Sequence, residues 1–281
     1  MIRFGGRVFT SAADPREIAK LHKSKGYTAA NVPKTPLEDK EKIRAVREAF
    51  AAENIMLAEV GYWENLVDID EAARKSNMEN MTKALYLAEE VGARCAVDTF
   101  GSYVRGKGNQ KFSGKNFSDD AFADAVDIAR SLIDTVKPKT AYFTYEMFPF
   151  NVVDSPEMIE KLIRAVDREM FGVHLDLCNL INCPRAYFSS GDIMRDCVKR
   201  FGNKIVSAHV KDIKLREPAI SVILEEVMPG EGGIDMHAYI REIHKLPFDI
   251  PFMMEHLQTE EEYDRAAAYI RKCAREENII I

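Results

Sequence analysis

Strand-like and helix-like patterns alternate along the whole chain at a spacing of about 35 residues. Such alternation is typical of repeated βα units, in which parallel strands form a sheet that helices cover. The strand-like segments lie near residues 2–4, 27–32, 55–60, 93–98, 140–146, 171–177, 205–210 and 251–256. Eight strands, each followed by a helical stretch, predict an α/β fold: a closed parallel (β/α)8 barrel that spans residues 1–281 as a single domain.

The clearest helical segment is 37–54, LEDKEKIRAVREAFAAEN. Ile43, Val46 and Phe50 fall on one stripe of a helix, with charged residues opposite, as expected for a helix that packs on a sheet. Other helical segments carry their own start signals. Ser155 precedes a first-turn proline, and Thr259 precedes three glutamates.

Composition narrows the function classes. The chain is 46% hydrophobic and 30% charged, with a formal net charge of -6, and its charges are interspersed rather than blocked. This excludes a basic footprint for nucleic acid or for an anionic membrane. The first ten residues lack the pattern of a signal peptide, and no stretch approaches the roughly 20 apolar residues of a membrane span. The expected location is therefore the cytoplasm, where five cysteines without a CxxC pair are expected to stay reduced.

Two long connections would emerge on the catalytic face of such a barrel, near residues 101–118 and 211–234. Long loops in a compact domain are commonly lids or binding loops. The alternation in AISVILEEV indicates a small hairpin within the second connection. The PGEGGID segment after it is expected to form a tight turn that leads into the seventh helix.

Four side chains that can bind metal stand at the ends of four successive predicted strands. They are Glu146 in AYFTYEM, Asp176 in FGVHLDL, His209 in IVSAHV and Glu255 in PFMMEH. Polar side chains at the C-terminal ends of barrel strands face the active site. Three carboxylates converging without a cation would repel one another and raise one another's pKa values. The pattern therefore predicts one divalent metal ion, with Mn²⁺ expected and Mg²⁺, Co²⁺ or Zn²⁺ compatible with the same ligands.

Two further polar residues share a strand face with these candidate ligands. His174 is two residues before Asp176, and Lys211 is two residues after His209, so strand alternation points each pair to the same side. His174 is a candidate for binding a ligand carboxylate or the substrate, or it is a hydrogen-bonded core histidine. Lys211 is a candidate for stabilising an oxyanion, or it forms a structural ion pair.

The segment AEVGYWENL follows the third predicted strand and contains Glu59 and Trp63. These two residues fit the wall of a sugar site, where an aromatic face meets C–H groups, although a tryptophan that anchors the loop is the alternative. His256 directly follows Glu255, so it should point away from the barrel interior unless the strand has already ended.

Several motifs in fixed order resemble the xylose isomerase-like TIM-barrel superfamily, specifically its sugar phosphate isomerase/epimerase group. They are AEVGYWENL, YEMFPF, LDLCNLINCPRAYF, SAHVKDIKL, PGEGGIDMHAYI and MMEHL. The resemblance covers essentially the whole chain and implies the same four metal ligands. It also implies that Glu146 and Glu255 act as an acid/base pair on opposite faces of the substrate, as in the ketose 3-epimerases. The second histidine of those epimerases is Asn179 here, which can still bind hydroxyl groups, and their arginine is Leu215.

The resemblance implies a metal-dependent isomerase or epimerase that converts a sugar or sugar phosphate through a metal-bound enediolate. A homo-oligomer, dimer or tetramer, is common in this family. Glu146, Glu255, His174 and Lys211 are the expected catalytic residues, and Glu59, Trp63, Asn179 and Arg185 the expected substrate-binding ones.

Three alternatives stay open. A dehydratase of the inosose type, or a lyase that cleaves carbon-linked glycosides, would use the same site with His174 as leaving-group acid. An apurinic-site endonuclease would need more histidines around the mouth than this chain offers. A sugar-binding barrel without catalytic activity would keep the metal and turn nothing over.

Overall fold

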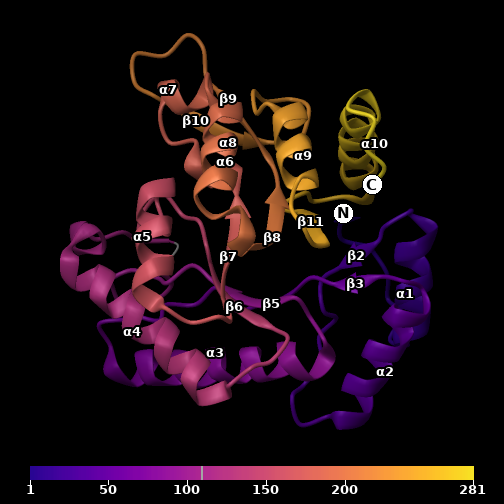
Figure 1. Cartoon of the computed structure of the whole chain (residues 1–281), viewed down its shortest axis with the longest axis horizontal. Coiled ribbons are helices and arrows are strands. Elements are labelled where there is room, and N and C mark those ends of the chain that lie inside the picture. Colours follow the sequence, from indigo (N-terminus) through magenta and orange to yellow (C-terminus); the bar gives the residue numbers. More distant parts are fainter. Residues whose placement is uncertain (109) are drawn as a thin grey trace.

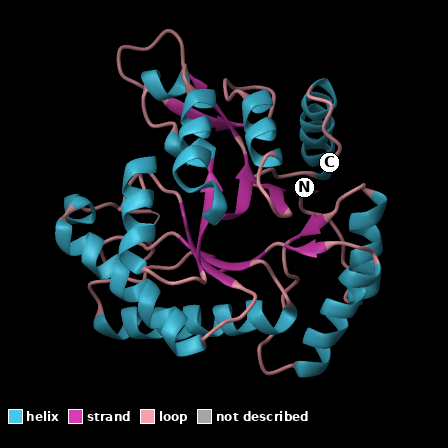
Figure 2. Ribbon diagram, in the orientation of Figure 1, coloured by secondary structure: helices cyan, strands magenta, loops and turns pink. Residues whose placement is uncertain are grey.

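Parallel strands surround the centre of the molecule in a nearly closed sheet, and helices surround the sheet (Figure 1, Figure 2). The structure is a computed structural model that describes residues 1–108 and 110–281. In spatial order the strands are β3 (Met56–Leu57), β2 (Ala29–Ala30), β1 (Ile2–Gly5), β11 (Ile250–Met254), β8 (Ile205–Val210), β7 (Phe171–Asp176), β6 (Tyr142–Glu146), β5 (Cys95–Asp98) and β4 (Glu59–Gly61). The predicted (β/α)8 barrel is confirmed.

The two ends of this sheet meet at Ala58. The predicted strand 55–60 is interrupted there and forms β3 and β4 instead of one strand. The Ala58 N–H donates to the carbonyl of Ala30 at 2.8 Å, and its carbonyl accepts from the Cys95 N–H at 3.2 Å. Ala58 therefore bonds to the segments on both sides of it. If β3 and β4 are counted as one interrupted strand, the nine strands form a closed barrel of eight.

Helices follow the strands in the order that the periodicity predicts. The main helices are α1 (Pro15–Ser24), α2 (Lys40–Ala52), α3 (Glu71–Val91), α4 (Asp119–Val136), α5 (Pro156–Val166), α8 (Ser190–Phe201), α9 (Met236–His244) and α10 (Glu260–Glu276), with the short helices α6 (Leu177–Leu180), α7 (Pro184–Tyr187), η1 (Gly114–Phe117) and η2 (Gly202–Lys204). The predicted stripe of α2 is buried. Ser155 caps α5, and Thr259 forms a capping box with Glu262 at the start of α10.

The main core lies between the sheet and the helices. Phe143 and Phe252 on the strands, and Phe50 and Leu132 on the helices, are almost fully buried. Burying each such side chain stabilises the fold by about 1.5–3 kcal/mol relative to leaving it exposed. This packing fixes the strands, and with them the side chains at the strand ends.

The second long connection contains the predicted hairpin, formed by β9 (Asp212–Leu215) and β10 (Leu224–Val227). Only β10 comes from the AISVILEEV segment, because β9 directly follows the barrel strand β8. The Asp212 carboxylate accepts the backbone N–H groups of Gly230, Gly232 and Ile234 at 3.0 Å each. These bonds hold the predicted tight turn before α9.

The first long connection, 101–118, is described apart from residue 109 and ends in η1. Within the described part of the chain, no helix combines the length and the apolar character that crossing a membrane requires.

Candidate active site

The four candidate ligands come together at one end of the barrel. Glu146 and Asp176 are the last residues of β6 and β7, His209 lies near the end of β8, and Glu255 follows the last residue of β11. These strands are consecutive neighbours in the sheet. Each of the four side chains offers an atom within 4.8 Å of the others. Four segments far apart in sequence therefore converge on a volume that one ion could fill.

The His209 ring lies between carboxylates on both of its nitrogens. Its Nδ1 is 3.1 Å from Glu146 Oε1 and 2.9 Å from Glu255 Oε2, and its Nε2 is 3.1 Å from Glu59 Oε1. Burial lowers the pKa of His209, but the three carboxylates outweigh burial and raise that pKa well above its ordinary value. Because Glu146 and Glu255 both lie at Nδ1, this nitrogen is the one that faces the other candidate ligands.

Lys211 places a second positive charge in the same cluster. Its ammonium group is almost fully buried and lies 2.9 Å from Asp176 Oδ2 and 2.8 Å from Glu255 Oε2. Although burial opposes it, the carboxylates raise the pKa of Lys211 above its ordinary value. The ammonium group and His209 together offset the mutual repulsion of the three carboxylates.

The carboxylates themselves sit in different environments. Burial raises the pKa of Asp176 to about 6, an effect that Lys211 only partly offsets. Burial acts in the same direction on Glu146, yet His209 holds the pKa of that carboxyl at about 2. Glu146 is therefore ionised at neutral pH and available as an acceptor.

Trp63 and Asn179, both expected near the substrate, contact the candidate ligands directly. The Trp63 indole Nε1 donates to Glu146 Oε2 at 2.7 Å. The Asn179 amide donates to Asp176 Oδ2 at 3.0 Å and to the carbonyl of Met147 at 2.9 Å. Both side chains also line the cavity above the cluster, so they can orient the carboxylates and still reach a bound molecule.

Three of the expected catalytic or substrate-binding residues lie outside the cavity lining. Glu59 and His174 are buried beside His209, and the His174 ring packs edge-on against it at 4.1 Å between centroids. Burial lowers the pKa of His174 to about 4. Arg185 is exposed on α7.

The cavity at the strand ends has a volume of about 350 Å³ and a lining of Trp63, Thr99, Glu146, Phe148, Asn179, Lys211, Glu226, Glu255 and His256. Sequence reasoning missed Glu226 as a site residue. Its side chain binds His256 Nδ1 at 2.9 Å from the hairpin strand β10. The strand β11 ends at Met254, before His256, and His256 adopts a left-handed φ of 60°. Its side chain is therefore free of strand alternation and lines the cavity.

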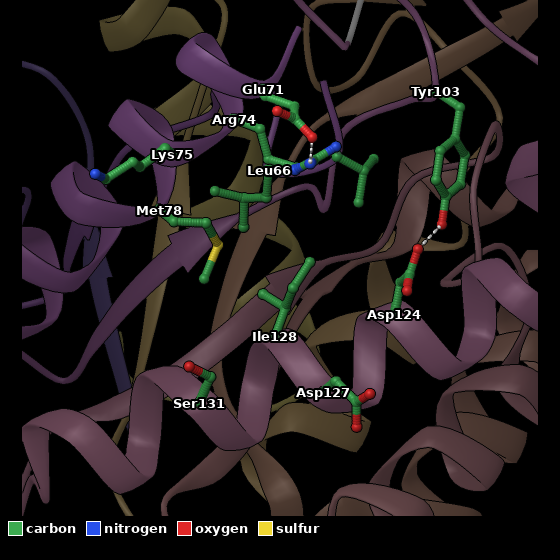
Figure 3. A pocket seen from close by; sticks show the side chains of 11 residues that line it. Leu66, Glu71, Arg74, Lys75, Met78, Tyr103, Asp124, Asp127, Ile128 and Ser131 are labelled. Carbon is green, nitrogen blue, oxygen red and sulfur yellow. Dashed lines mark hydrogen bonds and ion pairs between the residues drawn. The ribbon is translucent and has the colours of Figure 1, made fainter. Parts of the chain in front are cut away.

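A larger hollow of about 620 Å³ lies away from the strand ends, on the outside between α3 and α4 (Figure 3). Its acids are engaged separately: Glu71 pairs with Arg74, and Asp124 accepts from the Tyr103 hydroxyl (Figure 3). These acids do not converge, unlike the four candidate ligands at the strand ends.

A family model described as xylose isomerase-like TIM barrel matches residues 19–273. The chain belongs to this family. A comparison with curated proteins finds no significant match.

Solved structures share the fold at low sequence identity. D-psicose 3-epimerase from Clostridium cellulolyticum H10 with D-tagatose is 15% identical, with a TM-score of 0.70 and 99% of each chain covered. A probable 3-DHS dehydratase from Bacillus anthracis is 14% identical, with a TM-score of 0.69 over 96% of this chain and 98% of the other. A xylose isomerase-like TIM barrel protein from Mycobacterium smegmatis in complex with magnesium is 14% identical, with a TM-score of 0.66 over 93% of this chain and 88% of the other.

Proposed function

We propose that the protein is a metal-dependent carbohydrate epimerase or isomerase in which Glu146 and Glu255 exchange a substrate proton. The observation that carries this proposal is the convergence of Glu146, Asp176, His209 and Glu255 within 4.8 Å of one another, with Glu146 and Glu255 also lining a cavity. An epimerase and a dehydratase share this fold, which is consistent with carbon-acid chemistry on a small hydroxylated substrate.

The residues present fit a divalent ion. Three carboxylates and one imidazole suit Mn²⁺, Mg²⁺, Co²⁺ or Zn²⁺, and a similar barrel protein holds magnesium. His209 would bind through Nδ1, while Glu59 accepts from Nε2 and holds the ring in place. A carboxylate behind a metal-binding histidine fixes its tautomer and orientation. When bound, the ion would act as a Lewis acid that polarises a substrate carbonyl and acidifies the neighbouring C–H.

The chain's own residues would carry the proton. One glutamate of the pair removes the proton next to the carbonyl, and the other returns a proton to the enediolate. Return on the opposite face of the same carbon is epimerisation, and return to the adjacent carbon is isomerisation. Lys211, which is already positively charged beside Glu255, would stabilise the developing oxyanion.

The cavity favours an uncharged carbohydrate over a sugar phosphate. The basic residues in its lining are Lys211 and His256, and each is already paired with a carboxylate. Arg185, expected to bind substrate, lies outside that lining.

Elimination with His174 as leaving-group acid receives no support. The ring is 0% exposed, packs against His209 and does not line the cavity. A leaving-group acid must lie within hydrogen-bond reach of the leaving hydroxyl, and of the four expected catalytic residues His174 is the one that does not line the cavity.

Hydrogen exchange with solvent tests the proposal. In D2O, the metal-loaded protein should introduce deuterium at the carbon next to the carbonyl of at least one ketose or aldose. Proton NMR measures the loss of the C–H signal at that carbon. Glu146→Gln and Glu255→Gln should each slow exchange by about 100-fold or more, because each removes a candidate metal ligand together with a proton-transfer group that alone contributes that much. Glu231→Gln, an exposed acid on the neighbouring turn, is the matched control and should exchange normally. Absence of exchange across the sugars, from protein shown to hold its metal, would contradict the proposal.

A further inference from the structure

Three phenylalanines form a cluster beside the mouth of the cavity. Phe112 comes from the connection after β5, and Phe148 and Phe150 come from the connection after β6. The rings of Phe112 and Phe150 are stacked at 3.9 Å with 11° between their planes. Phe148 lies 6.0 Å from the first ring and 5.7 Å from the second. We call these three side chains the aromatic platform.

The aromatic platform is continuous with the cavity. Phe148 is part of the cavity lining, as is Trp63. Phe112 and Phe150, one ring further out, are 44% and 42% exposed. Aromatic surface therefore runs from the wall of the polar cavity outward onto the surface of the protein.

Buried amides hold the platform in place. The Asn116 side chain, fully buried, donates to the carbonyl of Phe150 at 2.8 Å and accepts the N–H of Tyr103 at 3.1 Å. Asn151, also fully buried, donates to the carbonyl of Thr99 and accepts the N–H of Val153. These bonds tie the two connections together and hold the backbone at Phe150, on whose ring Phe112 stacks.

Exposed aromatic rings at the mouth of a cavity can bind the apolar face of a sugar ring. Large apolar side chains left in water next to a polar cavity mark binding surfaces. The face of a sugar ring carries C–H groups that pack on an aromatic face while its hydroxyls stay in water. A monosaccharide in the cavity would leave Phe112 and Phe150 uncovered, whereas a second ring attached to it would cover them.

We propose that the aromatic platform is a subsite for the outer sugar ring of a glycoside whose inner sugar occupies the cavity. This inference rests on the proposed function, because it assumes that the cavity receives a carbohydrate. It adds a substrate class, glycosides in place of free monosaccharides. The platform then acts in binding and leaves the proton transfer to Glu146 and Glu255.

Binding titrations test the subsite. The chain has one tryptophan, Trp63, which lines the cavity, so its fluorescence reports occupancy. Maltose, cellobiose, lactose and sucrose are compared with glucose, galactose and fructose on metal-loaded protein. At least one disaccharide should bind about tenfold more tightly than its component monosaccharides, as expected for one added ring contact on an aromatic face. Phe112→Ala and Phe150→Ala should each remove that difference and leave monosaccharide affinity unchanged.

Phe188→Ala is the matched control, because Phe188 is 74% exposed and pairs with Tyr187 away from the platform. It should bind disaccharides as the unmodified protein does. Equal affinity for disaccharides and monosaccharides, or no disaccharide binding, would overturn the proposal. So would platform variants that dissociate an oligomer in size-exclusion chromatography without changing sugar affinity, since that result would assign the platform to contact between copies. Failure of the proposed function alone would show as a preserved disaccharide preference without hydrogen exchange.

Discussion

Glu59 is the residue whose position changes most between the expected and the observed site. The sequence places it beside Trp63 on a sugar-binding wall, but its side chain is buried and contacts His209 Nε2 at 3.1 Å. The two residues are 150 positions apart, and local pattern carries no signal for such a pair. Glu59 therefore acts, in our account, as a positioning residue for a metal-binding imidazole.

Glu59→Gln is expected to weaken metal binding by about 10- to 100-fold, because outer partners of metal-binding histidines contribute on that scale. The amide keeps the size of the side chain but lacks the negative charge that favours an Nε2–H. Competition with a fluorescent chelator measures the affinity. Glu64→Gln, which changes a partly exposed acid that pairs with Lys107, should leave the affinity unchanged. Equal affinities for both variants and the unmodified protein would remove Glu59 from the account.

Among the elements, the strands give the clearest prediction from sequence: polar side chains at their C-terminal ends face the active site. The positions expected for Glu146, Asp176 and His209 at the ends of β6, β7 and β8 agree with the structure, because period-two alternation and the ends of strands depend on residues close together in sequence. The sequence does not show that β11 stops at Met254, so the inward turn of His256 cannot be predicted from it. The partner of His256 comes from a hairpin whose facing depends on tertiary packing rather than on its own residues.

β5 carries a prediction about pH. Its last residue, Asp98, is fully buried, and burial raises the pKa of its carboxyl to about 8 against three opposing backbone N–H groups. Between about pH 4 and pH 8 the folded protein therefore holds a proton that the unfolded chain has released. The free energy of unfolding should fall as pH rises through this window, by up to about 1.4 kcal/mol per pH unit.

Asp98→Asn should flatten the pH dependence of the free energy of unfolding, because the amide cannot ionise. The amide oxygen can still accept the N–H of Glu64, which lies 3.3 Å from Asp98 Oδ2 in the unmodified protein. Urea unfolding at about pH 5.5 and pH 7.5 gives the two free energies for each protein. Asp127→Asn, an exposed acid on α4, should retain the pH dependence of the unmodified protein. The same slope in Asp98→Asn would show that this carboxyl is already ionised in the folded state.

At the scale of the whole molecule, alternation of strands and helices was enough to predict the barrel, because a parallel sheet with helical crossovers has few alternatives at this length. Closure then explains why residues from 59 to 255 meet at one point. The break at Ala58 and the aromatic platform were beyond such reasoning. Both depend on which backbone groups and rings face each other across different connections.

The metal content of the purified protein shows whether Glu146, Asp176, His209 and Glu255 form a metal site. We expect about one Mn, Mg, Co or Zn ion per chain by plasma mass spectrometry after reconstitution and gel filtration. Glu146→Gln and His209→Ala should both lose it while circular dichroism shows a retained fold. Close to three zinc ions per chain would favour a nuclease-type site. A folded protein that takes up no metal would contradict the convergence of the four ligands and the proposed catalysis together.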